Sequence, residues 1–232
     1  MRNKTRKTRT LATLATAALV AFTPLKAEAQ KDNPNLSVSS DIANQSRFWG
    51  MPFLDTPHYK QSINLDYKNL STSIVAHADV NQGRFFDVDL LVSYSHPLSS
   101  IFSVYGGGLG FAYHNEEKIE PGAIAYAGVE AEVPLNPSVT YSKLFGFGGG
   151  DYIESAVSED IPKTGINLTG KLGWNHNALW EGTGFTHAEG IATTTIDLSD
   201  NIQFSPRLNY ISPFIEDVPR GFLVGANLSF TF

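Results

Sequence analysis

Apolar residues recur at every second position along most of this sequence, from Leu36 to its last residue. In the final segment, GFLVGANLSFTF (residues 221–232), the apolar positions are Phe222, Val224, Ala226, Leu228, Phe230 and Phe232. A β-strand places alternate side chains on opposite faces, so a period of two predicts extended segments with one apolar and one polar face. None of the segments carries a helical pattern, and the sequence therefore predicts an all-β fold.

Twelve segments show this pattern, and turn residues separate them. They span residues 36–46, 58–67, 71–80, 84–95, 101–113, 122–133, 138–147, 151–160, 165–175, 186–198, 202–211 and 221–232. Most contain the roughly 9–11 residues that a tilted strand needs to cross a lipid bilayer, whereas strands of soluble proteins most often have about 5–6. Short turns alternate with mostly longer loops between the segments, which is typical of transmembrane β-barrels.

No stretch of about 18 apolar residues follows the first segment of the chain, so the sequence predicts no transmembrane helix there. In lipid, only helices and closed barrels satisfy every backbone hydrogen-bonding group. We therefore predict a transmembrane antiparallel up-and-down β-barrel of 12 strands, with 10 or 14 strands as alternatives. An even number of strands leaves both termini on the periplasmic side. A periplasmic or secreted β-sandwich is the soluble alternative.

The first 29 residues have the three parts of a secretory signal peptide. Basic residues at positions 2, 4, 6, 7 and 9 precede an apolar run over residues 11–22, and Ala27-Glu28-Ala29 forms a small-x-small cleavage pattern. The apolar run is too short for a stable membrane anchor. We therefore expect cleavage after Ala29, which leaves one domain, residues 30–232, exported to the outer membrane of a Gram-negative bacterium.

The net charge and the cysteine content exclude some classes of binding partner and of chemistry. Without residues 1–29 the chain keeps 11 of its 17 basic and 22 of its 23 acidic residues, a net charge of −11. Such a chain has no basic stripe that could neutralise phosphates, so we expect no nucleic-acid partner. The absence of cysteine excludes a disulfide framework, thiol chemistry and a lipoprotein anchor.

The alternating C-terminal strand that ends in Phe230 and Phe232 resembles the signal recognised by the bacterial outer-membrane assembly machinery. The chain also resembles the TorF-like family of bacterial outer-membrane β-barrel proteins. That resemblance is carried by LSVSSDIANQSRFWG (36–50), INLDYKNLSTSIVAHADV (63–80), SVTYSKLFGFGGGDYIESAVSEDIP (138–162) and INLTGKLGWNHN (166–177). The family's arginine-glycine pair is replaced here by Arg47-Phe48-Trp49-Gly50. Nucleoside-channel barrels are similar in size and strand number and are a second candidate relative.

The polar face of each strand is expected to line the lumen, because a charged side chain in lipid costs up to about 2–4 kcal/mol. Ten carboxylates fall on that face, against Lys60, Lys171 and Arg207. An acidic lumen favours cations. We expect the following residues to set selectivity: Asp87, Asp89, Glu130, Glu132, Lys171 and Arg207. Pairing of these charges in a narrow or plugged lumen is the alternative.

We expect no enzyme, no cofactor and no metal site. The histidines considered as catalytic candidates are His77, His96, His114, His176 and His187. None of these five has a lipid-facing serine two residues away, as a lipid-hydrolysing barrel would require. The i, i+2 acid pairs Asp87/Asp89 and Glu130/Glu132 supply oxygens of the kind that Ca²⁺ prefers. Such pairs are more often solvated lumen residues.

The sequence therefore predicts a passive channel that conducts small cationic or neutral solutes through an acidic lumen and contacts outer-membrane lipid and the barrel-assembly machinery. A non-conducting structural or surface-binding barrel is the alternative. The first long loop is unusually apolar for an exposed loop, with Phe48, Trp49, Met51 and Phe53. It would either fold inward as a plug or form an adhesive patch.

Overall fold

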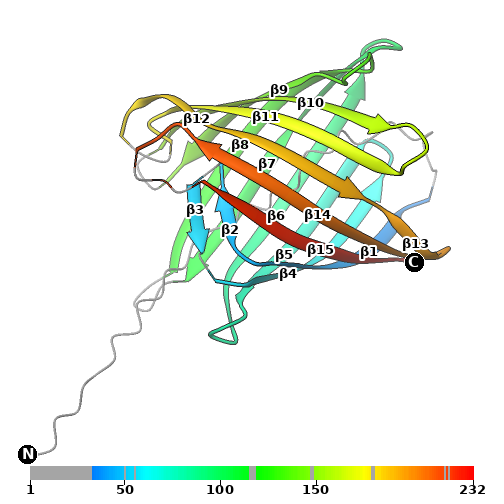
Figure 1. Cartoon of the computed structure of the whole chain (residues 1–232), viewed down its shortest axis with the longest axis horizontal. Coiled ribbons are helices and arrows are strands. Elements are labelled where there is room, and N and C mark those ends of the chain that lie inside the picture. The colour runs from blue at the N-terminus through cyan, green and yellow to red at the C-terminus, as the bar shows by residue number, and fades with distance from the viewer. Residues whose placement is uncertain are drawn as a thin grey trace, which may run out of the picture.

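The predicted closed barrel is confirmed by a computed structural model that describes residues 33–49, 51–54, 56–114, 119–146, 149–178, 181–216, 218 and 220–232. The expected signal peptide, residues 1–29, lies outside these ranges. The described part of the chain folds as an all-β barrel (Figure 1). It has no helix long and apolar enough to span a membrane.

Twelve strands form the wall within the described residues, and each pairs antiparallel with its neighbours. They are β1 (Asn35–Ala43), β4 (His58–Tyr67), β5 (Leu70–Asp79), β6 (Arg84–Pro97), β7 (Phe102–His114), β8 (Ile119–Ala131), β9 (Ser138–Phe145), β10 (Gly150–Ile161), β11 (Ile166–His176), β12 (Thr183–Thr194) continued by β13 (Ile196–Ser199), β14 (Ile202–Pro213) and β15 (Gly221–Thr231). We count β12 and β13 as one interrupted strand, since both pair with β14.

Pairing between the first and last strands closes the wall. The β1–β15 ladder runs over seven residue pairs, from Ser37–Thr231 to Ala43–Gly225. The twelve segments predicted from the sequence correspond one by one to these strands. We call the end that carries residues 214–216 and the long connection after β1 the loop end, and the opposite end, where Phe232 lies, the terminal end.

The long connection between β1 and β4 contains a small hairpin that the sequence predicted only as a loop. Its strands are β2 (Ser46–Phe48) and β3 (Met51–Leu54). The hairpin lies at the loop end, away from the C-terminus (Figure 1). It is not part of the barrel wall, because β2 and β3 pair only with each other.

Side chains alternate between the two faces of the wall as predicted. Large apolar residues of the outer face stay exposed to the surroundings of the chain, among them Ile63, Leu65, Ile74, Leu90, Val92, Leu208 and Val224. The positions between them are buried and mostly polar, including Ser62, Ser73, Thr140, Ser142 and Asn209. An apolar belt around a polar interior is the arrangement that a barrel needs in a bilayer.

One prediction about the faces is wrong, at the start of β6. Period-two alternation with Asp87 and Asp89 in the lumen places Phe86 on the lipid face, but Phe86 is only 3% exposed and Phe85 is 60% exposed. The cause is a β-bulge: Ala78 pairs with Phe85 and His77 with Asp87, so Phe86 is an extra residue in the ladder. A bulge re-aims side chains locally and thereby shifts the alternation by one residue.

Three glycines on the inner face of β7 and β8 are each covered by an aromatic ring from the neighbouring strand. Three cross-strand pairs join a ring to a glycine: Phe111–Gly122, Tyr105–Gly128 and Tyr126–Gly107. A Cβ added at Gly122 or Gly128 would collide with the facing ring, and one at Gly107 would collide with the Val92 carbonyl and the Tyr126 hydroxyl. Rings that cover glycines in this way stabilise a bent, closely packed sheet.

Exchange of one of these glycines for alanine tests the packing of the wall. We expect Gly107→Ala to lower the free energy of unfolding by about 1–3 kcal/mol, because the added methyl group overpacks the contact with β6. Gly110→Ala is the matched control, because it lies on the same strand and a Cβ there meets no atom within 4 Å. Urea unfolding of the refolded barrel, followed by the heat-modifiable shift in gel mobility, measures both variants. Equal midpoints for the two would contradict the packing argument.

Candidate functional site

The interior of the barrel has an apolar part and a charged part. The apolar part covers the inner wall from β6 to β10 and consists of Leu91, Leu109, Phe111, Ile124, Tyr126, Leu144 and Tyr152. Trp49 from the β2–β3 hairpin and Ala178 from the β11–β12 connection complete the same cluster. Two connections of the loop end therefore reach into the barrel and bury apolar surface there.

Trp49 makes the contact that holds the hairpin inside. Its ring stacks on Tyr152 of β10, with ring centroids 4.2 Å apart and an angle of 12° between the planes. Both side chains are buried. The backbone of Trp49 has a positive φ of 48°, as expected at a tight hairpin turn. Predicted loop residues Phe48, Met51 and Phe53 lie in β2 and β3, and their side chains are outside what the structure describes.

The β11–β12 connection is folded by two asparagines. The Asn175 side chain donates to the Gly182 carbonyl and accepts from the Ala178 backbone N–H, both at 3.0 Å. Asn177, in the left-handed region with φ 57°, accepts from the Gly182 N–H at 2.8 Å. These bonds turn the chain so that Ala178 is buried against the apolar cluster.

The charged part of the lumen begins at β1 and β14. Arg207 donates two hydrogen bonds to the two carboxylate oxygens of Asp41, and the Nη2–Oδ1 distance is 2.8 Å. Asp41 is almost fully buried. Lys60 of β4 interacts electrostatically with both Asp41 and Asp89. Arg207, which the sequence placed in the lumen, is therefore engaged in a forked ion pair across the barrel seam.

A second set of charges lies on β10, β11 and β12. Lys171 donates to Glu154 at 3.0 Å, and both side chains are largely buried. Glu189 accepts a hydrogen bond of 2.8 Å from the Asn209 amide. Lys171, which the sequence also placed in the lumen, is thus held by a carboxylate on the neighbouring strand.

Two histidines and two aspartates meet near the loop end on β4, β5 and β6. The His58 Nε2 and His77 Nδ1 atoms are 3.1 Å apart, and the other nitrogen of His77 lies 3.1 Å from Asp89 Oδ2. Asp87 faces His77 directly across the β5–β6 ladder. The sequence predicted inward-facing His77, Asp87 and Asp89, but not His58, because an isolated histidine at a strand end carries no spacing signal.

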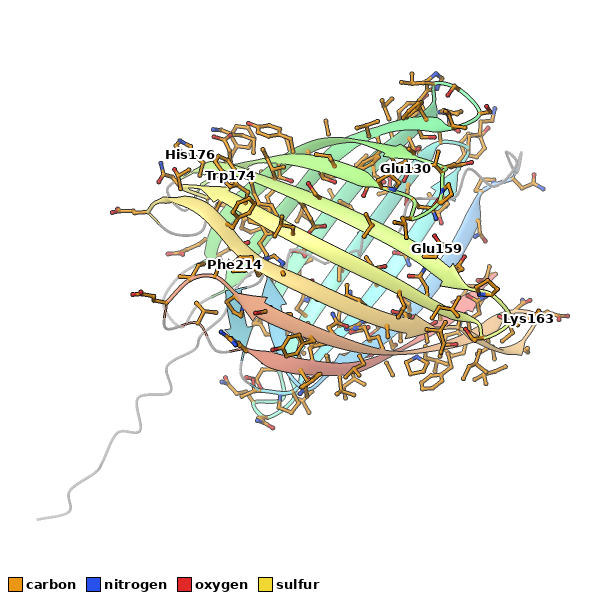
Figure 2. The ribbon with its side chains drawn as sticks, turned by 45° about the horizontal axis from the view of Figure 1, so that its top comes forward. Glu130, Glu159, Lys163, Trp174, His176 and Phe214 are labelled. Carbon is orange, nitrogen blue, oxygen red and sulfur yellow. The ribbon has the colours of Figure 1, made fainter. Side chains whose placement is uncertain are left out.

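The four acids chosen as selectivity residues are not brought together. Asp87 and Asp89 lie in the half of the barrel near the loop end. Glu130, although buried, lies toward the terminal end (Figure 2). Glu132 follows the last residue of β8 and is exposed, with its backbone N–H bonded to the Ile101 carbonyl at 2.9 Å.

Aromatic side chains gather at the rim of the loop end (Figure 2). Trp174 stacks on His176 with centroids 6.1 Å apart, and Phe185 meets Phe214 edge-on at 6.4 Å. Phe185 and Phe214 are exposed. Rings at the border of the apolar belt suit the interface between lipid and water.

The comparison with solved structures agrees with this geometry. A KdgM porin covers 84% of this chain and 99% of its own length, with a TM-score of 0.60 and 14% identity. A NanC porin covers 84% and 98%, with a TM-score of 0.55 and 12% identity. An outer membrane channel from Pseudomonas putida F1 covers 90% and 99%, with a TM-score of 0.53 and 10% identity. The chain shares the fold of these porins.

The comparisons of the sequence itself found no match. No family model matches it. No curated protein matches it either. The identities of 10–14% to the porins show a common fold, so any shared solute must be argued from the residues of this lumen.

The Asp41–Arg207 pair gives a test of the charged part. We expect Arg207→Met to lower the free energy of unfolding by about 3 kcal/mol, because it removes the forked ion pair that offsets the buried Asp41 carboxylate. Adding Asp41→Asn should recover most of that loss, since the buried charge is then removed. A double-mutant cycle of urea unfolding measures the coupling, and strictly additive effects would argue against the pair.

Proposed function

We propose that this chain is a passive channel of the Gram-negative outer membrane for small hydrophilic solutes. The observation that carries the proposal is the closed twelve-stranded wall with an apolar outer belt and a polar, charged interior. A soluble sandwich would bury its apolar face, whereas here that face is the one left exposed. The three similar structures described above are porins or channels, and we propose a transport role with no catalytic step.

The charge of the lumen supports cationic or neutral solutes. Inward-facing acids outnumber Lys60, Lys171 and Arg207, and two of these three bases are already paired with Asp41 and Glu154. One KdgM structure is a complex with oligogalacturonate. That ligand carries a carboxylate on each sugar, and an acid-rich lumen would repel it. We therefore propose that this barrel favours solutes of the opposite or no charge.

We propose that the β2–β3 hairpin is the plug of this channel. The stack of Trp49 on Tyr152 joins the hairpin to the far wall of the lumen and supports an inward position rather than an adhesive surface patch. The alternative is a barrel in which Trp49 and Tyr152 never separate, so that the lumen stays closed. Such a barrel would be non-conducting and would act through the exposed aromatic rim of its loops. The buried stack is the observation that favours this second function.

The membrane context of the proposal follows from the same features. We propose that the outer belt contacts outer-membrane lipid, that Phe230 and Phe232 of the last strand are read by the barrel-assembly machinery, and that residues 1–29 are a cleaved export signal. Phe232 is exposed at the terminal end, beside the ladder that closes the wall. We also propose that the chain is related to the TorF-like family of outer-membrane barrels, which it resembles.

Conductance tests the plug. We expect Trp49→Ala to raise the open fraction of the channel roughly two- to tenfold, because an aromatic pair contributes about 0.5–1.5 kcal/mol beyond its buried area. Trp174→Ala is the matched control, since it removes the same ring from the outer face. Single-channel recordings of the purified barrel in planar bilayers measure both variants. A folded barrel that conducts in neither form would favour the non-conducting function.

Ion selectivity tests the acidic lumen. We expect the wild-type reversal potential in a salt gradient to show cation preference, and the double variant Asp87→Asn/Glu130→Gln to move it toward zero. A chelator in the buffer removes divalent ions, which could bind at Asp87 and neutralise its charge during the measurement. Glu159→Gln, at the same end as Glu130 but on the outer face (Figure 2), removes a charge outside the lumen and should leave the potential unchanged. Anion preference in the wild type would contradict the proposal.

A further inference from the structure

Three potential metal ligands converge on the inner wall where β5 meets β6. One donor atom from each of His77, Asp87 and Asp89 can be chosen so that all three lie within 4.8 Å of one another. The three residues are 0%, 2% and 0% exposed, so they are held in place by their surroundings. The acid pair that the sequence predicted to be solvated is therefore buried beside an imidazole.

The bulge at Phe86 builds this arrangement. Because Phe86 is an extra residue, Asp87 comes to lie directly opposite His77, and the inward alternation resumes with Asp89. Phe86 itself turns inward and lies 5.9 Å from the ring of His58 and 6.2 Å from that of His77. Bulges recur next to functional sites, where they re-aim side chains. This bulge directs two carboxylates at one imidazole and covers the rings with an apolar side chain.

His58 fixes the orientation of His77. The two rings are stacked with centroids 5.2 Å apart and planes 6° from parallel, and a nitrogen of each shares one hydrogen bond. In one tautomer, His77 donates from Nε2 to Asp89 and accepts from His58. In the other, His77 donates from Nδ1 to His58, and the Nε2 lone pair then faces the Asp89 carboxylate. That second state is stabilised by a proton on Asp89 or by a metal ion that both groups bind.

We propose that His77, Asp87 and Asp89 bind a divalent transition-metal ion, with Zn²⁺ as the best-matched representative, and that His58 is the residue that positions His77. One imidazole and two carboxylates suit borderline metals, whereas Ca²⁺ prefers six to eight oxygen ligands. Three protein ligands leave a coordination position for a water molecule. A histidine that binds a metal through one ring nitrogen usually forms a hydrogen bond through the other nitrogen, as His77 does with His58.

Charge balance supports a cation at this place. Two buried carboxylates lie close together, and Lys60, the nearby base, is shared with Asp41. A proton on His77 offsets one of the two negative charges, and a divalent ion offsets both. The hydrogen-bond chain from His58 through His77 ends at Asp89, whereas a metal ion would be bound by both carboxylates.

Metal titration of the purified, untagged barrel in detergent tests the proposal independently of conduction. We expect calorimetry to show one Zn²⁺ per chain, and Co²⁺ to give visible absorption bands that Zn²⁺ displaces. Asp87→Asn and His77→Gln should each weaken Zn²⁺ binding at least tenfold. His58→Phe should weaken it about 10- to 100-fold, as loss of a second-layer partner does.

Glu189→Gln is the matched control, because it neutralises a buried lumen carboxylate on another part of the wall while keeping an acceptor for Asn209. The heat-modifiable gel shift verifies that each variant is folded, and the Co²⁺ spectrum of the wild type needs no variant at all. Absence of the stoichiometric Zn²⁺ event, equal affinity in Asp87→Asn and Glu189→Gln, or tighter binding of Ca²⁺ than of Zn²⁺ would each overturn the assignment.

Discussion

Closure of the backbone hydrogen-bond network is the constraint on which this structure depends. The β1–β15 ladder leaves no open sheet edge in the wall formed by the described residues, and this allows the apolar face of every strand to point outward. Most polar side chains of the wall are thereby directed into one confined interior. The ion pairs of Asp41 and Glu154, and the meeting of His77 with Asp89, follow from that confinement, because a charged group there needs a partner.

The apolar part and the charged part of the interior are built from different interactions. The apolar wall of β6–β10 packs aliphatic side chains together with rings that lie on glycines in cross-strand pairs such as Phe111–Gly122. The charged wall is built from paired side chains that keep the lumen polar. The β2–β3 hairpin joins the two, since it leaves β1 on the charged side and places Trp49 on the apolar side.

The strands were predictable from the sequence because period-two alternation reports directly which face of a barrel strand is apolar. The exception at Phe86 shows the limit of this signal: two adjacent phenylalanines fit either register, and the bulge that chooses between them depends on how β6 pairs with β5. The site was predictable only in part. Asp87 and Asp89 were found from their spacing, whereas the contact of His58 with His77, and the stack of Trp49 on Tyr152, join residues with no common sequence pattern.

The contact that seats the hairpin also differs in kind from those that line the opposite wall. Trp49 and Tyr152 meet through uncharged ring faces, whereas Asp41, Glu154 and their partners meet through full charges. Dissolved salt screens a charged lumen against passing ions and leaves a stacked pair of rings almost unaffected. In the proposed channel, ionic strength would therefore change the preference among ions without unseating the hairpin, so that selectivity and opening would respond to different properties of the solution.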